Sequence, residues 1–477
     1  MAGVFLALAQ QNAFFDRERP SALGSCDFRM LIAYADLGQP TMLRDQILAE
    51  PHITQVDLFD AASGTPTLQQ LQQYNIVFAF SNSAWNNAVG MGNVLADYQD
   101  GGGVIVVGTF AWDVTGGLLQ GRWITGGYSP YNPTDLSTFS NNTANITQPS
   151  HALMRGVSSL GAFFRNGVSL TSGASAVAMW TDLPSAAASA VAYKTNNGTT
   201  AVGISAYLGN QFSGQWGHVI VNAGRWLLAQ PATDFDHNRK PDYVLYNGGT
   251  RQTAVWYMNN NVFLGGAYGP NLPAGWNVID VADFNSDGNP DYALFNPATR
   301  QTAIWYLSGV TFVGGLFGPI LPSGWTLVAT GDFNDDCKPD YVLYNASTRQ
   351  TAIWYMNNNV FVNGVFGPTL PPGWSLAGVA DFDGDGNRDY LLFNASTRQT
   401  AIWYLSGVTF VGGAFGPTIA SGYQLQGTAD FNGDGKPDYL LYNPTTRQTA
   451  IWYLNNNTLI SGAFGPILPA GWNLVAP

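Results

Sequence analysis

The chain is short of charge, and above all of positive charge. Only 19 of its 477 residues are Lys or Arg and 31 are Asp or Glu, which gives a formal net charge of −12 at pH 7. A basic stripe that could release counterions from nucleic acid is therefore missing, and we expect no nucleic-acid partner. For the same reason, we expect no polybasic contact with an anionic membrane surface.

Cysteine, histidine and long apolar runs are also scarce. The chain has only two cysteines, Cys26 and Cys337, which lie far apart in the sequence and make up neither a disulfide framework nor a thiolate metal cluster. The four histidines, at positions 52, 151, 218 and 237, follow no metal-ligand spacing. No apolar run is long enough to span a bilayer.

Residues 1–26 are predicted to be an N-terminal extension. The run "MAGVFLALAQ" ends in Ala7-Leu8-Ala9, as a signal peptide does, but no basic residue precedes it. Two interpretations stay open: the remnant of a signal peptide, or an ordinary buried or docking segment.

What the chain has in excess is glycine, asparagine and aromatic side chains. There are 55 glycines, and aromatic residues make up 13% of the sequence. This composition favours many short strands and tight turns over long solvated helices.

Residues 27–230 alternate between strand-like and helix-like segments. Strands are predicted at 30–35, 53–59, 75–81 and 103–110, and helices at 40–50, 67–74 and 85–102. This order predicts a flavodoxin-like α/β domain with a parallel sheet and flanking helices. From about 120 to 215 we expect loops and short strands, and at 217–229 a strand or turn that leads into a helix.

Residues 231–477 repeat with a period of 49, from Asp234, Asp283, Asp332, Asp381 and Asp430. Each repeat holds about four predicted strands, which is the spacing of a propeller blade. The first repeat lacks the strand that precedes each later aspartate loop, and "GWNLVAP" at 471–477 has no loop after it. We therefore predict an all-β, five-bladed propeller that the C-terminal strand closes.

Each repeat begins with a nine-residue acidic loop, for example "DFDGDGNRD" at 381–389. Oxygen-bearing side chains stand at positions 1, 3, 5 and 9, and the backbone carbonyl of position 7 adds a further oxygen. Ca²⁺ prefers six to eight oxygen ligands on a compact, curved backbone. The predicted ligands are Asp234, Asp236, Asn238, Lys240 and Asp242; Asp283, Asn285, Asp287, Asn289 and Asp291; Asp332, Asn334, Asp336, Lys338 and Asp340; Asp381, Asp383, Asp385, Asn387 and Asp389; and Asp430, Asn432, Asp434, Lys436 and Asp438.

Up to five Ca²⁺ ions would largely balance the net charge of −12. The sites are predicted to be unequal, because Arg239 and Cys337 replace the glycine of position 6 and Asn238 replaces an aspartate. Loops 1 and 3 should therefore bind more weakly than the others. The alternative interpretation is a polar turn that was repeated by duplication and is held by Asx hydrogen bonds.

These loops and repeats resemble the FG-GAP/VCBS family. The resemblance implies a calcium-stabilised propeller for extracellular recognition or adhesion. Some fungal propeller lectins have similar loops and bind sugars between blades, which makes a glycan a possible ligand.

Two further sets of residues recur once per blade. The tryptophans could pack between blades or form platforms for sugar rings, and the arginines could bind a ligand or anchor turns. The sets are Trp256, Trp305, Trp354, Trp403 and Trp452, and Arg251, Arg300, Arg349, Arg398 and Arg447.

The N-terminal half resembles the class I glutamine amidotransferase-like fold, especially its trehalose-utilisation-like branch. The resemblance rests on "GGGVIVVGTFAW" (101–112), "SHALMRGVSSL" (150–160) and "GHVIVNAGRWLL" (217–228). Active members carry a cysteine on the turn after the central strand, where this chain has Thr109 and Phe110. His151 and His218 have no evident cysteine partner, so no catalytic residue is assigned. Ser81 and Asp113 stand on expected sheet-top loops, but that position defines no mechanism.

The sequence thus predicts a non-enzymatic, calcium-binding protein of the extracellular space or cell surface that recognises a glycan or protein. Two alternatives stay open. One is a structural subunit of an extracellular filament or surface array that self-assembles. The other is a hydrolase activity in the N-terminal domain.

Overall fold

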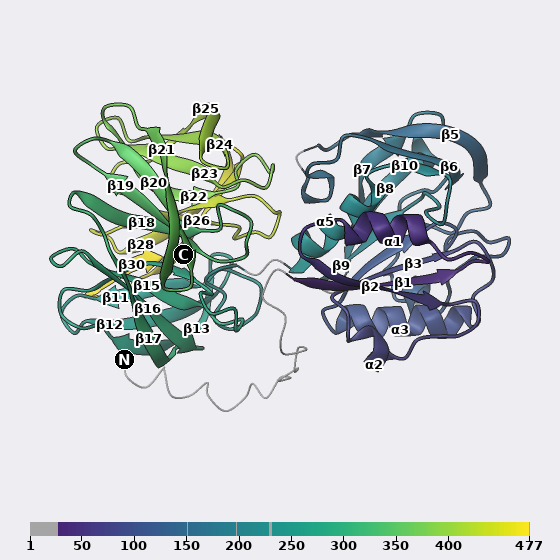
Figure 1. Cartoon of the computed structure of the whole chain (residues 1–477), viewed down its shortest axis with the longest axis horizontal. Coiled ribbons are helices and arrows are strands. Elements are labelled where there is room, and N and C mark those ends of the chain that lie inside the picture. Colours follow the sequence, from purple (N-terminus) through teal and green to yellow (C-terminus); the bar gives the residue numbers. More distant parts are fainter. Residues whose placement is uncertain (1–26, 150, 197, 229–230, 477) are drawn as a thin grey trace. The chain divides into compact units, whose positions relative to one another are not determined.

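A computed structural model describes residues 27–149, 151–196, 198–228 and 231–476 (Figure 1). The predictions for residues 1–26 lie outside these described residues. The described chain forms two compact units, of which the first ends at residue 228 and the second begins at residue 231. Among the described helices, none is long and apolar enough to cross a membrane.

The first unit contains a ten-stranded sheet, half of which is parallel. The parallel strands lie in the order β2 (Ile53–Asp60), β1 (Phe28–Ala35), β3 (Ile76–Ser81), β4 (Val104–Gly108) and β9 (Thr199–Ile204). β3 and β4 are buried along their whole length, as strands are when helices cover both faces of a sheet. This half confirms the predicted flavodoxin-like arrangement.

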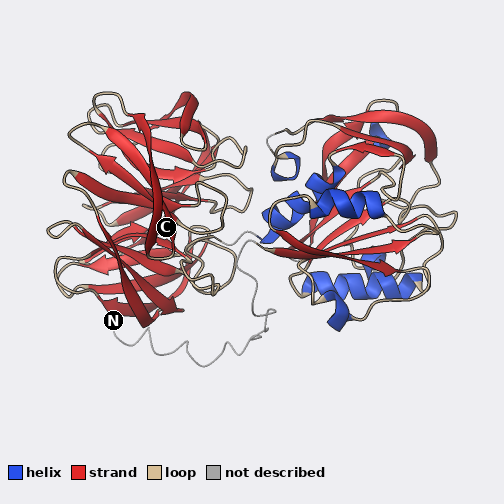
Figure 2. Cartoon of the chain, viewed as in Figure 1, coloured by secondary structure: helices blue, strands red, loops and turns tan. Residues whose placement is uncertain are grey.

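Helices cover both faces of the parallel strands (Figure 2). α1 (Thr41–Leu48) and α5 (Trp216–Leu228) pack on one face, in a core with Ile32, Phe78 and Val106. The other face packs against α2 (Leu68–Leu71), α3 (Ala88–Asp100) and α4 (Arg122–Thr125). α5 corrects one prediction, because the segment expected to begin as a strand or turn is helical from Trp216. Its buried Val219, Ile220 and Ala223 recur at helical spacing, and their packing outweighs the β-propensity of the valines and isoleucine.

The other half of the sheet is antiparallel, where the sequence predicted mainly loops. It adds β8 (Ser189–Asn196), β7 (Ala174–Trp180), β5 (Ser137–Ile146), β6 (Leu160–Asn166) and β10 (Phe212–Gly214). Two short 3₁₀ helices, η1 (Ala152–Met154) and η2 (Ser185–Ala187), connect these strands. The sheet is therefore mixed rather than parallel. A short connection such as the one between β8 and β9 permits only antiparallel pairing.

The second unit is a propeller of five four-stranded antiparallel sheets. Blade 1 has β30 (Trp472–Ala476), β11 (Tyr243–Asn247), β12 (Gln252–Asn259) and β13 (Val262–Asn271). Blade 2 has β14 (Asn277–Ala282), β15 (Asp291–Asn296), β16 (Gln301–Ser308) and β17 (Thr311–Ile320). Blade 3 has β18 (Trp325–Gly331), β19 (Asp340–Asn345), β20 (Gln350–Asn357) and β21 (Val360–Thr369). Blade 4 has β22 (Trp374–Ala380), β23 (Asp389–Asn394), β24 (Gln399–Ser406) and β25 (Thr409–Thr418). Blade 5 has β26 (Gln424–Ala429), β27 (Asp438–Asn443), β28 (Gln448–Asn455) and β29 (Thr458–Ile467).

The C-terminal strand closes the ring, as predicted. β30 pairs antiparallel with β11, with Leu474 opposite Leu245 and Asn473 opposite Tyr246. It also lies between the inner strands β14 and β26 of the two adjacent blades. The first blade therefore takes its inner strand from the far end of the chain, and this strand covers the inner edge of β11.

Aromatic pairs join each blade to the next. The phenylalanine at position 2 of each acidic loop is buried and meets a buried tyrosine of the following blade edge to face. The pairs, with ring centroids 6.3 to 6.5 Å apart, are Phe235–Tyr292, Phe284–Tyr341, Phe333–Tyr390, Phe382–Tyr439 and Phe431–Tyr243. The repeated Asp-Phe dipeptide thus contributes to the packing of the ring as well as to the loops.

Candidate functional site

The five acidic loops share one backbone conformation. Each precedes the second strand of its blade, and the residues at positions 4 and 6 have positive φ in every loop. These residues are His237 and Arg239, Ser286 and Gly288, Asp335 and Cys337, Gly384 and Gly386, and Gly433 and Gly435. The sequence predicted the special turn at position 6, where Arg239 and Cys337 carry a Cβ that this conformation disfavours. It missed position 4, although the glycines at 384 and 433 were a signal.

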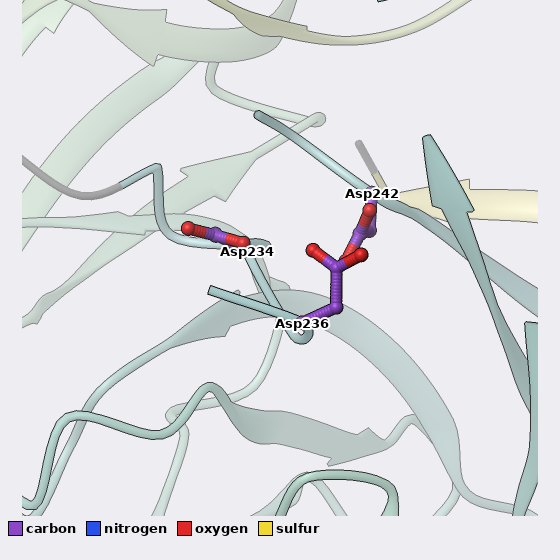
Figure 3. A group of neighbouring side chains, drawn as sticks. All are labelled: Asp234, Asp236 and Asp242. Carbon is purple, nitrogen blue, oxygen red and sulfur yellow. The ribbon is translucent and has the colours of Figure 1, made fainter. Parts of the chain in front are cut away.

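Three carboxylates converge in two of the loops. Asp234, Asp236 and Asp242 of loop 1 bring oxygens within 4.8 Å of one another (Figure 3). Asp381, Asp383 and Asp385 of loop 4 do the same. Position 3 is an aspartate only in these two loops, whereas Asn285, Asn334 and Asn432 offer an amide oxygen there. The structure therefore brings predicted ligands together and leaves the predicted ranking of the loops untested.

The aspartate at position 9 is buried and joins the loop to its own blade. In loop 2, Asp291 Oδ2 accepts the amide hydrogen of Phe284 at 3.1 Å, and Oδ1 accepts that of Leu307 at 3.0 Å. The same two hydrogen bonds recur at Asp242, Asp340, Asp389 and Asp438. The sequence predicted only a metal ligand here and missed this second role.

Position 1 also accepts backbone hydrogen bonds. Asp283 accepts from the amides of Asp287 at 3.1 Å and Gly288 at 2.8 Å, as an Asx-type turn does. At position 7, the amides of Lys240, Asn289, Lys338, Asn387 and Lys436 donate to the side chain at position 5. These bonds are compatible with a metal, because an ionised carboxylate has about four lone-pair sites.

Electrostatics in the loops disfavours ionised carboxylates. Burial, with smaller contributions from Asp283 and Asp287, raises the pKa of Asp291 to about 7 despite its two amide hydrogen bonds. The pKa of Asp242 is raised to about 8, chiefly by burial, and that of Asp234 to about 6. A hard cation among these groups would favour their ionised forms.

The repeated tryptophans pack within their own blades. Trp305 contacts Phe312 of the outer strand with ring centroids 4.7 Å apart, and Trp256, Trp354 and Trp403 make the same contact with Phe263, Phe361 and Phe410. In blade 5, Leu459 stands at the sequence position of that phenylalanine. Trp354 also borders an apolar cavity of about 110 Å³ with Trp325 and Phe366. Packing therefore explains four of the five tryptophans, and one of these four also lines a cavity.

The repeated arginines occupy turns. Arg251, Arg300, Arg349, Arg398 and Arg447 all have positive φ, and their carbonyls accept the amide hydrogens of Leu272, Leu321, Leu370, Ile419 and Leu468. The Arg398 side chain donates to the carbonyl of Ile419 at 2.9 Å. The turn-anchor interpretation accounts for these contacts.

In the first unit, the turn after β4 and the two histidines considered as catalytic candidates make structural contacts. Thr109 is fully buried and Phe110 nearly so on the turn after β4. His151 Nδ1 accepts the amide hydrogen of Leu153 at the start of η1, and His218 Nδ1 lies 2.7 Å from Glu50 Oε2. His218 Nε2 lies 2.8 Å from the carbonyl oxygen of Arg155, which also accepts a hydrogen bond from Asn222.

The two sheet-top residues are also held by hydrogen bonds. Ser81 donates to the carbonyl of Gly117 at 2.9 Å. Burial opposes ionisation of Asp113, but hydrogen bonds from Thr115, Ser137 and Asn166 outweigh it and lower the pKa of this carboxyl. Both side chains support the loops after β3 and β4.

A polar group that the sequence did not predict lies where the order of the parallel strands reverses. Asp36 follows β1 and Asn82 follows β3, and Asn82 Nδ2 donates to Asp36 Oδ1 at 3.0 Å. The Tyr207 hydroxyl donates to the other oxygen of Asp36. The available signal was a polar residue directly after each of two buried strands, Asp36 after β1 and Asn82 after β3, because such strand ends meet at a switch point.

Comparison with known proteins supports the predicted type of repeat. Residues 332–424 match the FG-GAP-like repeat family. Among curated proteins, none matches the chain. A propeller with FG-GAP-like repeats indicates a binding or recognition role.

Solved structures resemble each half of the chain. A ThuA-like protein from Bacteroides uniformis is 12% identical, with 44% of this chain and 95% of that chain covered and a TM-score of 0.32. A β-galactosidase from Rahnella sp. is 15% identical, with 61% and 39% covered and a TM-score of 0.30. The Dos1 propeller is 11% identical, with 46% and 56% covered and a TM-score of 0.25. At these identities and TM-scores, the resemblances support no statement about activity.

Proposed function

We propose that the chain is a non-enzymatic, calcium-binding recognition protein of the cell surface or extracellular space, whose propeller binds a glycan or protein in adhesion. The observation that supports this proposal is the fivefold acidic loop with its buried carboxylates. Because burial and mutual repulsion disfavour their ionised forms, a divalent cation would stabilise the loops.

Each loop supplies oxygens suited to Ca²⁺. Side chains at positions 1, 3, 5 and 9 and the carbonyl of position 7 offer five donors, and water can complete a shell of six to eight. The N-terminal unit, which lacks a cysteine at Thr109 and Phe110, would act as a structural or docking domain. The hydrolase alternative gains no support from the histidine contacts.

Calcium removal tests this proposal. A ligand that binds only the folded state at 100 times its dissociation constant stabilises that state by about 2.7 kcal/mol per site. Chelation should therefore lower the melting temperature of the propeller transition, and added Ca²⁺ should restore it. The N-terminal transition serves as the internal control. An unchanged propeller transition, together with no metal by elemental analysis, would refute calcium binding.

A structural role in a filament or array is a second candidate function. The exposed apolar side chains of the outer strands favour it. Phe317, Phe366, Phe415 and Phe464 are 69% to 72% exposed. The five outer strands, β13, β17, β21, β25 and β29, contain no charged residue. Edge strands usually carry charges that prevent association with other chains. Polymers visible by electron microscopy at rising concentration would support this candidate, and the quadruple Phe→Ser variant should then stay monomeric.

A further inference from the structure

The five blades alternate in the turn between their last two strands. Blades 1, 3 and 5 carry Asn260, Asn358 and Asn456 at the same place, whereas blades 2 and 4 carry Gly309 and Gly407. Because five is an odd number, the alternation cannot close around the ring. Blade 5 is followed by blade 1, and both have an asparagine turn. We call this interface the seam.

Hydrogen bonds hold the blade 1 turn against blade 5. The Tyr453 hydroxyl donates to Asn260 Oδ1 across the seam. Next to it, Asn261 Nδ2 donates to the carbonyl of Phe464 at 3.0 Å. These contacts fix the Asn260 side chain beside loop 5.

A cavity of about 380 Å³ opens at the seam, within the size range of small-molecule sites. Loop 5 contributes Asn432, Asp434 and Lys436, and Lys436 Nζ donates to Asn455 Oδ1 at 2.8 Å. Asp434 Oδ2 accepts from Asn432 Nδ2 at 3.1 Å. Because Asn432 and Asp434 are predicted Ca²⁺ ligands, the polar groups left for a further ligand are the Asn260 and Asn455 amides and the Lys436 ammonium.

Among the five interfaces, whose turn and loop residues are all described, the seam alone combines these groups. Blades 1 and 3 have Lys240 and Lys338 at the position of Lys436, but the next blade offers only a glycine. Blades 2 and 4 face an asparagine turn, but have Asn289 and Asn387 in place of the lysine. The lysine and the asparagine of the next blade meet only where blade 5 joins blade 1.

We propose that the seam cavity binds one saccharide per propeller, an inference that rests on the recognition function proposed above. Sugar hydroxyl oxygens suit the NH₂ groups of Asn260 and Asn455 and the Lys436 ammonium, all of which are hydrogen-bond donors. The Tyr453 ring and Ile460, which also line the cavity, provide apolar surface for the C–H face of a sugar. The seam thus supplies a single site that the fivefold repeat does not contain.

Isothermal titration of the full chain in millimolar Ca²⁺ tests this site. The probes are galactose, N-acetylglucosamine and glucuronic acid. At least one should bind with a stoichiometry of one per chain. Five equal sites, or no binding of any probe at millimolar concentration, would overturn the proposal.

Two matched pairs of variants locate the site. Asn260→Gly should weaken binding at least tenfold, whereas Asn358→Gly should leave it unchanged, and glycine suits the positive φ of both positions. Likewise, Lys436→Asn should weaken binding at least tenfold, whereas its control Lys338→Asn should leave binding unchanged. Equal loss in a variant and its control would refute a site at the seam. If saccharide binding is absent while chelation still destabilises the propeller, the seam site fails and calcium binding stands.

Discussion

The two units of the chain bury charge in opposite ways. In the N-terminal unit, the fully buried Arg165 donates to both oxygens of Asp182, at 2.6 and 2.8 Å, and its guanidinium lies over Trp180. The hydrogen bond from Arg165 lowers the pKa of Asp182. In the propeller, the buried Asp291 accepts only backbone amide hydrogens, and burial raises its pKa to about 7. Arg165 thus balances the charge of Asp182 within the first unit, whereas burial at Asp291 in the propeller favours the protonated carboxyl.

Removal of the closing strand should have the largest effect. Deletion of residues 471–477 takes the inner strand from blade 1 and exposes the backbone of β11. We expect the cooperative propeller transition to disappear and the protein to aggregate, while the N-terminal transition persists in calorimetry. A truncated chain that stays monomeric and equally stable would contradict ring closure.

Loss of a buried aspartate should come next. Asp291→Ala leaves two buried amides without acceptors, at about 1–3 kcal/mol each, so the propeller should lose about 2–6 kcal/mol. Asp287→Ala, at an exposed position of the same loop, is the matched control for denaturant unfolding with chelator present. Equal effects of both substitutions would show that the buried hydrogen bonds add nothing.

The pH dependence of the two transitions should differ in sign. Because the folded pKa of Asp291 is raised, chelated propeller should lose stability as pH rises from about 4 to 8. Asp182 has a lowered folded pKa, so its contribution is present at neutral pH and is lost as pH falls below about 4. Calorimetry across this range measures both transitions. If the stability of the chelated propeller rises with pH, the predicted difference between the two units is wrong.

The loops themselves should differ in affinity for Ca²⁺. Loops 2, 4 and 5 should fill first, and loop 4 should be tightest because its four side-chain ligands are all aspartates. Titration should show at least two classes of site, and Asp385→Ala should remove a tight one, whereas Asp45→Ala on α1 should not. Arg239→Gly should tighten loop 1, because the substitution removes a positive charge next to the predicted Ca²⁺ ligands. Five equal sites would refute the ranking.

The smallest effect concerns contacts between blades. The Tyr306 hydroxyl donates to Asn358 Oδ1 at 2.6 Å, so Tyr306→Phe should cost about 1 kcal/mol of propeller stability. Tyr257→Phe is the control, because the next blade has Gly309 at the place of Asn358. Both are measured by chemical unfolding, and equal costs would show that the hydrogen bond contributes nothing.

The sequence by itself determined the propeller, its five blades and its closing strand. A period of 49 residues and a strand missing at one end and present at the other suffice for these conclusions. It also determined which carboxylates meet in loops 1 and 4, since residues so close along the chain meet through local backbone conformation. The acidic loop and the strand pattern each occur five times, so the prediction did not depend on a single occurrence.

Tertiary structure alone decided how the distant parts pair. The antiparallel half of the first sheet, the Arg165–Asp182 pair and the amide partners of Asp291 all join residues separated in the chain by other elements or loops. The sequence likewise shows the alternating turns, but only the closed ring brings Asn260 to Tyr453, 193 residues away. Contacts of this kind depend on the packing of whole strands and blades, which no local pattern of residues specifies.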